Sequence, residues 1–303
     1  MSFYRLFSRL KDFLVSSLYR RVLTARIIAH LLRKLCPEIK FIGLENQSGK
    51  LFLFIKDNVI TPYSIAMKEN FQTEDLSRAL QICTQKGQSL RGLFLDVGAN
   101  IGTATLAALA SKHGYFSGAM CFEPEPNNLQ MLRLNLRENH LDSKVKIIGI
   151  AIGASKSKLH LMLSNHNFGD HRLSLDLDKN INHENHLEVE VNSLENILYQ
   201  ENIPPNDVSL VWIDTQGFDG FVLKGAMPLF AARVPFCVEM CPDLGRVNGA
   251  YEMALEIIES KCENFYDLGS PNWQIPQVAN TVRNYLSFLE NTDKHTDLLI
   301  FPK

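Results

Sequence analysis

Short apolar runs alternate with amphipathic helical stretches along most of the chain, and this alternation limits the possible folds more than any other feature. The runs are continuously apolar, which is typical of strands buried on both faces of a parallel sheet. Strand and helix in regular succession predict an α/β fold, with a mainly parallel, Rossmann-like sheet of the seven-stranded type and helices on both faces. The expected strands are 93–97, 119–122, 145–150, 208–213 and 236–238, and the expected helices are about 103–112, 126–140, 218–231 and 249–262.

The 303 residues are divided into two expected parts. Residues 1–38 are predicted to form a basic amphipathic helical segment, and 39–303 a single domain. Within that domain, lead-in strands and a helix over 39–90 precede the Rossmann-like core over 91–303.

One region of the core breaks the alternation of strands and helices. Two further strands are expected near 159–163 and 187–191. Between them, Asn165 to His186 is rich in His and Asn and poor in large apolar residues, so we expect a long exposed loop. A last strand is expected at 297–301.

The N-terminal segment combines positive charge with a helical apolar period. Phe3, Phe7, Leu10 and Leu14 recur at three- or four-residue spacing, and residues 1–40 carry nine Lys or Arg but only two acids. The segment could lie on an anionic membrane surface, or it could pack on the domain or on a second copy, which is the commoner fate of such helices. Mitochondrial targeting is a weaker third alternative.

Charge and cysteine content bear on partners and location. The rest of the chain is acidic, so no nucleic-acid partner is expected. Six scattered cysteines form no zinc-like set and suggest a reducing, cytoplasmic location, with peripheral contact at the inner membrane face as an option. Membrane contact or self-association would then run through residues 1–36.

The clearest local motif is FLDVGANIG at 94–102, a strand that ends in an acid, a glycine turn and a helix start. Gly98 allows close backbone approach to a ligand, and Gly102 lets the helix pack on the strand. NAD fingerprints have a glycine where this chain has Asn100, and Asp96 would repel a pyrophosphate. The acid suits the ammonium and sulfonium end of S-adenosylmethionine (SAM) instead. The expected cofactor-binding residues here are Asp96, Gly98, Ala99, Asn100 and Gly102.

Further acids end three more expected strands. Glu123, in FEPEP at 122–126, lies where a carboxylate holds a ribose diol in such folds, and Pro124 follows it as part of the same binding turn. Asp214 ends the strand of WIDTQGFDG, and Glu239 ends that of FCVEM. Together with His171 or His166 of the expected loop, Asp214 and Glu239 are the candidates for accepting a proton from a substrate. No acid-rich set typical of a magnesium site is apparent near Asp214, so no metal is expected.

Over about residues 50–303, the chain resembles the FkbM-type methyltransferases. The resemblance rests on the motifs at 94–102 and 122–126, on WIDTQGFDGFVLKGA at 212–226, on FCVEM at 236–240 and on the closing segments at 264–270 and 296–303. It implies a class I methyltransferase fold in which Asp96, Gly98 and Glu123 bind SAM and Asp214 lines the site. Such enzymes mostly methylate hydroxyl oxygens, often on sugars or small metabolites, and so we expect an O-methyltransferase that acts on a glycan or small molecule.

One departure from the family and two rival functions remain at this point. Many members carry Val-Glu-Gly where this chain has Thr215-Gln216-Gly217, and a glutamine cannot act as a general base. The rivals are a catalytically inactive scaffold or membrane-associated binding protein that keeps the fold and, less favoured, an NAD-dependent oxidoreductase.

Overall fold

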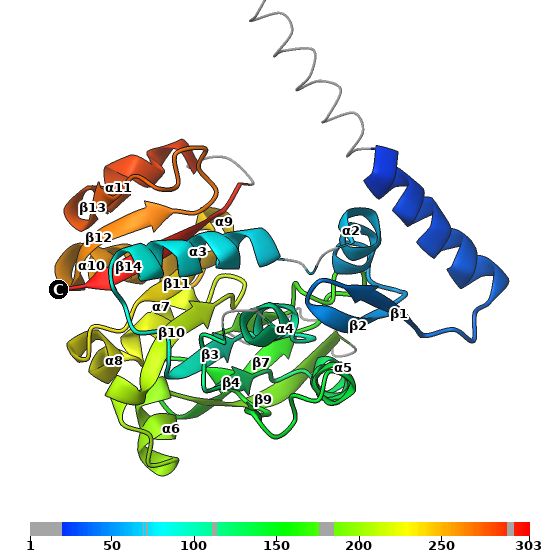
Figure 1. Ribbon diagram of the computed structural model, residues 1–303, viewed down its shortest axis with the longest axis horizontal. Helices are drawn as coiled ribbons and strands as arrows, with labels where there is room; N and C mark the ends of the chain where they lie inside the picture. The colour runs from blue at the N-terminus through cyan, green and yellow to red at the C-terminus, as the bar shows by residue number, and fades with distance from the viewer. Residues whose placement is uncertain (1–19, 69, 71, 111–113, 176–184, 290–293) are drawn as a thin grey trace, which may run out of the picture.

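The computed structural model describes residues 20–68, 70, 72–110, 114–175, 185–289 and 294–303. The expected helical positions Phe3, Phe7, Leu10 and Leu14 lie outside these residues. The described chain forms one large sheet, a smaller second sheet and an N-terminal helix–hairpin unit (Figure 1).

The large sheet has the order β13-β12-β14-β11-β10-β3-β4-β5 among the described strands. β5, β4, β3, β10 and β11 are mutually parallel, and β14 is antiparallel to both of its neighbours. This confirms the Rossmann-like fold of the seven-stranded type, to which the short β13 adds an edge. The bounds are β3 Leu93–Val97, β4 Gly118–Phe122, β5 Val145–Ile148, β10 Val208–Ile213, β11 Phe236–Met240, β12 Cys262–Asp267, β13 Gln277–Val278 and β14 Thr296–Pro302.

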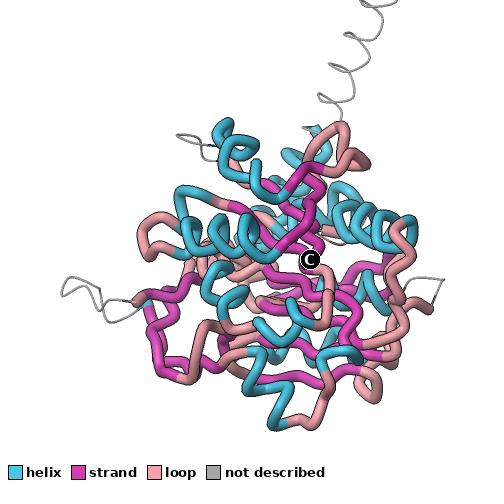
Figure 2. The backbone as a smooth tube through the Cα atoms, turned by 90° about the vertical axis from the view of Figure 1, so that its left-hand side faces the viewer, coloured by secondary structure: helices cyan, strands magenta, loops and turns pink. Residues whose placement is uncertain are grey.

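Helices cover both faces of this sheet, which explains why its strands are apolar throughout. Every residue of β4 and of β10 is buried. Successive residues of β10 point to opposite faces of the sheet. Leu210 and Trp212 pack in the core formed with α3, α4 and α5. Val211 and Ile213 pack in the core formed with α6, α7, α8 and α10. Figure 2 shows these layers from the side. The helices are α3 Thr73–Gln85, α4 Thr103–Ala110, α5 Pro126–Glu138, α6 Leu194–Gln200, α7 Asp219–Lys224, α8 Met227–Ala231 and α10 Ala250–Lys261.

The helix expected over 218–231 is two helices, α7 and α8. Gly225 ends the first, and a Cβ atom at this position would lie 2.1 Å from the carbonyl oxygen of Gly153. Pro228 stands at the start of the second, where its missing N–H does no harm. The break therefore lets the chain approach the neighbouring loop closely.

The second sheet has the order β6-β9-β7-β8 and corrects the expectation for Asn165–His186. This stretch is only partly an exposed loop, because Arg172–Ser174 forms β8 on β7 and residues 167–171 are half-buried. Residues 176–184 lie outside the described part. The other bounds are β6 Ala151–Ile152, β7 Ser157–Met162 and β9 His186–Asn192.

The lead-in consists of a helix over 20–35, a hairpin and α2 (Ile60–Met67). The hairpin strands, β1 Phe41–Asn46 and β2 Gly49–Phe54, pair antiparallel, and β2 packs on α5. Among the described residues, no helix is both long and apolar enough to cross a membrane. The remaining elements are short: α9 Pro242–Gly245, α11 Val282–Tyr285, and 3-10 turns at Pro205–Asp207, Ala279–Thr281 and Leu286–Leu289.

Candidate functional site

Four strands of the large sheet end level with one another and deliver acids to the same edge. Val97 is aligned with Phe122 and with Ile213, and Ile213 is aligned with Val238. Glu123, Asp214 and Glu239 each follow one of these residues, and Asp96 precedes Val97. In an open α/β sheet, the crevice beyond the strand carboxyl ends is the usual ligand site.

The turn after β3 can be built only with glycine at its first position. Gly98 has φ +85°, and a Cβ atom there would lie 1.9 Å from the carbonyl oxygen of Asp214. The N–H groups of Gly98 and Ala99 both donate to the carbonyl oxygen of Phe122 at 3.0 Å. Gly102, with φ +89°, would place a Cβ atom 2.6 Å from Leu132 of α5. These contacts hold the turn and α4 tightly between the strands and α5.

Asp96 is a buried carboxyl at the wall of the crevice. It is 1% exposed, and its Oδ2 accepts a hydrogen bond from the Thr105 N–H at 3.1 Å. Burial raises the pKa of Asp96 to about 7, against the lowering effect of Thr105. A cation beside it would therefore favour the ionised carboxylate.

Glu123 is equally buried and is fixed by two backbone amides. Its Oε2 accepts from the Asn100 N–H and its Oε1 from the Glu125 N–H, both at 2.8 Å. Burial raises the pKa of Glu123 to about 7. A carboxylate offers about four lone-pair positions, so both oxygens can accept a further hydrogen bond from a ligand. Pro124 lies beside it in the wall of the same pocket.

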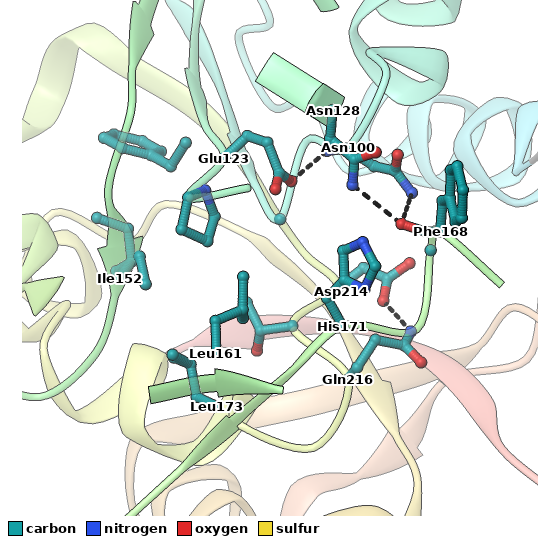
Figure 3. Close-up of a pocket in the computed structure, with 16 residues that line it drawn as sticks. Asn100, Glu123, Asn128, Ile152, Leu161, Phe168, His171, Leu173, Asp214 and Gln216 are labelled. Atoms are coloured by element: carbon teal, nitrogen blue, oxygen red, sulfur yellow. Dashed lines mark hydrogen bonds between the residues drawn. The ribbon is translucent and has the colours of Figure 1, made fainter. Parts of the chain in front are cut away.

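Glu123 opens into a narrow pocket that is mostly apolar (Figure 3). The walls come from the end of β4, from the second sheet and from the loop between β7 and β8: Phe122, Ala151, Ile152, Leu161, Phe168 and Leu173. Asn100 and Asn128 donate to the Phe168 carbonyl oxygen at 3.4 and 2.9 Å, while their own Oδ1 atoms are buried without a partner. Buried acceptors are rarely left unpaired, so these two oxygens suit the donors of a ligand.

A larger cavity of about 380 Å³ adjoins the narrow pocket. Gly98, Asn100, Gly169, Asp214 and Gln216 line both spaces, which therefore lie side by side. The larger cavity is acidic, and Ala99, Ile60 and Tyr63 also contribute to its walls. Its carboxyl groups are those of Glu74, Asp75, Asp96, Asp214, Glu239 and Asp297.

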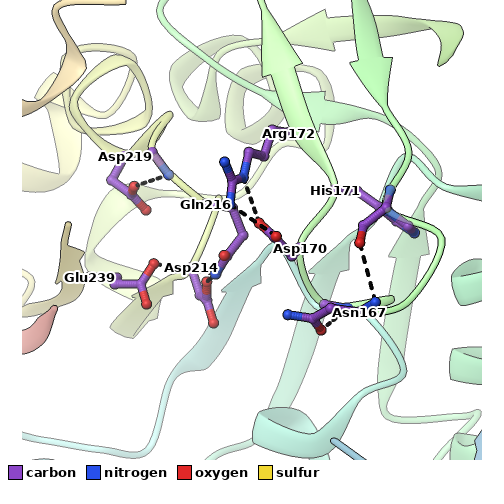
Figure 4. A network of polar contacts seen from close by, with 11 residues as sticks. Asn167, Asp170, His171, Arg172, Asp214, Gln216, Asp219 and Glu239 are labelled. Atoms are coloured by element: carbon purple, nitrogen blue, oxygen red, sulfur yellow. Dashed lines mark hydrogen bonds and ion pairs between the residues drawn. The ribbon is translucent and has the colours of Figure 1, made fainter. Parts of the chain in front are cut away.

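Two glutamines that are far apart in the sequence hydrogen-bond to the Asp214 carboxylate. Gln216 Nε2 donates to Oδ1 at 2.6 Å (Figure 4), and Gln72 Nε2 donates to Oδ2 at 2.5 Å. Both glutamines have positive φ, +51° and +65°, which is costly for a residue with a side chain and is often found at functional sites. Burial raises the pKa of Asp214, and the two amides oppose that rise.

Glu239 stands beside Asp214 and is less firmly bound. Gln216 Nε2 donates to its Oε2 at 3.3 Å, and His295 Nε2 lies 3.8 Å from its Oε1. Burial, with Asp214 and Asp297 nearby, raises the pKa of Glu239 well above its usual range. Asp297 is the cross-strand partner of Glu239 on β14, and burial likewise raises its pKa.

The structure separates His171 from Glu239 but not from Asp214. Asp214 lines both spaces, whereas Glu239 lines only the larger cavity and His171 only the narrow pocket. Its Nδ1 accepts from the Ser164 N–H at 3.0 Å, and burial lowers its pKa. His166 is exposed and lines neither space.

Asp219, from the same motif as Asp214, has a structural role. Its Oδ1 accepts from the Thr215 N–H at 3.0 Å and its Oδ2 from the Gly217 N–H at 3.1 Å, closing the loop before α7. Within the described ranges, no three or more His, Cys, Asp or Glu side chains are placed to hold a metal ion.

Several site residues carried no signal of their own in the sequence. Gln72 reaches Asp214 across 142 positions, and Asp297 was recognisable only as the start of a strand. Phe168 and Asn128 were likewise overlooked. The continuous apolar run 298–301 directly after Asp297 marks a buried strand, and its antiparallel pairing with β11 places Asp297 beside Glu239.

The chain was compared with known proteins. The family model described as Methyltransferase FkbM domain matches residues 96–267. A search of curated proteins found no match.

Solved structures similar to the chain include methyltransferases. The methyltransferase FkbM from Methylobacillus flagellatus KT is 15% identical, with a TM-score of 0.40 over 70% of this chain and 44% of that one, so the chain spans less than half of its length. The O-methyltransferase from Bacillus cereus, solved in complex with SAH, is 12% identical, with a TM-score of 0.41 over 77% of this chain and 82% of that one. An rRNA methylase from Streptococcus thermophilus is 10% identical, with a TM-score of 0.40 over 75% and 93% of the two chains.

Proposed function

The chain belongs to the FkbM family of methyltransferases, and we propose that it transfers the methyl group of SAM to a hydroxyl oxygen of a glycan or small metabolite. The observation that carries this proposal is a pair of adjoining spaces with different chemistry at one edge of the sheet. The narrow pocket is apolar with a buried carboxylate, and the adjoining cavity is rich in carboxyl groups.

The residues present fit SAM. In the narrow pocket, the apolar walls suit an adenine ring and Glu123 suits the two ribose hydroxyls. The unpartnered Oδ1 atoms of Asn100 and Asn128 are acceptors for ring or ribose donors. Asp96 lines the larger cavity, where a carboxylate suits the ammonium and sulfonium charges. When bound, SAM supplies a methyl group already activated by the positive sulfur.

The acceptor hydroxyl would enter the larger cavity, since that space adjoins the pocket assigned to the adenosyl group. A hydroxyl must lose its proton as its oxygen attacks the methyl carbon. Of the candidates Asp214 and Glu239, Glu239 is the better base. Burial raises its pKa, so its ionised form holds a proton more strongly, and its hydrogen bond from Gln216 is long. Asp214 accepts short hydrogen bonds from the side-chain amides of two glutamines, and we assign it to orienting the ligands. The proton therefore passes to Glu239.

His171 plays a different part in this proposal from the one expected of it. It lines the narrow pocket, and its Nδ1 is engaged by the Ser164 amide. We assign it to the wall around the adenosyl group. Gly98, Ala99 and Gly102 shape the turn after β3, and Pro124 forms the wall beside Glu123.

Two further parts of the proposal concern cellular location and metal use. All six cysteines are free, which supports a cytoplasmic location. No metal has a role in the proposed reaction, and activity should therefore survive EDTA.

Methyl transfer from labelled SAM to pools of glycans, lipids and small phenols tests the function. We expect label in a hydroxyl-bearing fraction, and a transfer rate at least about a hundredfold lower in Glu239→Gln, as for loss of a general base. Glu188→Gln changes an exposed glutamate and serves as the matched control. SAM binding without transfer to any pool would favour the inactive scaffold instead.

A further inference from the structure

The helix over residues 20–35 has one face turned to the protein. Ala25 and Ala29, four residues apart, are no more than 1% exposed. Arg33 Nη1 donates to Asn58 Oδ1 at 2.6 Å and to the Lys56 carbonyl oxygen at 3.4 Å. These contacts tie the helix to the segment that precedes α2, at one end of the molecule (Figure 1).

The opposite face is an exposed aliphatic stripe. At 100° per residue, its members fall within less than half of the helix circumference, away from Ala25 and Ala29. They are 43–72% exposed, although side chains of this size are usually buried. The stripe consists of Leu23, Ile27, Ile28, Leu31 and Leu35.

Basic side chains flank this aliphatic stripe. Arg26 lies along one border and Arg21 along the other, while Arg20 and Lys34 lie within the stripe at the two ends of the helix, and all four are exposed. Residues 20–35 contain five Lys or Arg and no Asp or Glu. An apolar stripe between cationic borders is the pattern of a helix that lies in the plane of an anionic membrane surface.

We propose that helix 20–35 docks on an anionic lipid surface, with the aliphatic stripe in the acyl boundary and Arg21, Arg26 and Lys34 at the headgroups. Charge selects this occupant over a second copy of the chain, because two such helices would bring cations together with no acid between them. The contact of Arg33 with Asn58 then holds the domain to the docked helix. This inference does not depend on the proposed function.

Sedimentation of the full chain with vesicles tests the proposal. The chain should sediment with vesicles containing phosphatidylserine but not with pure phosphatidylcholine. Raising the salt from about 0.1 M to about 1 M shortens the Debye length from about 10 Å to about 3 Å and should release it. Absence of binding at low salt would overturn the proposal.

Paired variants assign the binding to the stripe. Ile27→Glu with Leu31→Glu should lower vesicle affinity at least about tenfold while leaving the melting temperature unchanged, since both positions are exposed. Val247→Glu, at a 90% exposed aliphatic position elsewhere, should bind as the wild type does. Wild-type binding by the double variant would overturn the proposal. So would a lipid-independent dimer that the double variant dissociates, since it would assign the stripe to a second copy.

Discussion

Gly98 is the residue whose replacement the site tolerates least. Its φ of +85° is unfavourable for any side chain, and an added Cβ atom would lie 1.9 Å from the carbonyl oxygen of Asp214. Gly98→Ala should therefore lower the free energy of unfolding by more than about 3 kcal/mol, the upper range for strain at a single backbone position.

The variant Gly87→Ala separates the effect of the steric clash from that of the positive φ. Gly87 has φ +73° and nothing within 4 Å of an added Cβ atom, so this variant should lose only about 1 kcal/mol. Urea unfolding of both variants measures the difference. Equal losses would contradict the tight packing between the β3 turn and Asp214.

Sequence predicts some of these residues and not others for a physical reason. Asp96, Glu123, Asp214 and Glu239 were predictable, because each lies at the carboxyl end of an apolar run. Gln72 was not, because its role depends on a contact with Asp214 that only the folded chain creates. No local sequence pattern marks such a partner.

The ends of β3 and β4 give the site a pH dependence. The pKa of Asp96 and of Glu123 is raised to about 7 in the fold, against about 4 in an unfolded chain. Their contribution to stability is therefore complete below about pH 4 and is lost as the pH rises through about 7. A cationic ligand favours the ionised carboxylates, so its affinity should change in the opposite direction.

SAM affinity should thus increase between about pH 6 and pH 8, by up to about tenfold for each carboxyl that must ionise. Calorimetry at the two pH values measures this change. Asp96→Asn should remove part of the increase, and exposed Glu188→Gln should leave it intact. An affinity that is constant or falls with pH in the wild type would rule out this electrostatic account.

The sequence predicts the bounds of those strands that are buried on both faces of the sheet. β3 and β10 have the expected bounds, because strands covered on both faces are apolar throughout. The break between α7 and α8 was missed, because the pattern continues across Gly225 and the close approach to Gly153 is tertiary. The polar composition of 167–171 predicts an exposed loop, but this segment lies in the wall of the narrow pocket, a tertiary contact that composition does not reveal.

At the scale of the whole molecule, the helix over 20–35 lies outside the site. Among the described residues, none before Val59 lines either of its two spaces. A chain that starts at Cys36 should therefore keep its affinity for SAH, even though it loses the contact of Arg33 with Asn58. Calorimetry on the truncated chain, with circular dichroism to show that it is folded, measures this. A folded truncation that no longer binds SAH would contradict the separation.

The central claim, that one edge of the sheet holds SAM, is tested most directly by calorimetric titration of SAM and NAD into the wild type, Asp96→Ala and Glu123→Ala. The wild type should bind SAM and not NAD. Glu123→Ala should weaken SAM binding by about 1.5–3 kcal/mol, as for loss of hydrogen bonds to a charged group, and Asp96→Ala should weaken it as well. Unchanged SAM affinity in both variants, or binding of NAD in place of SAM, would contradict the account.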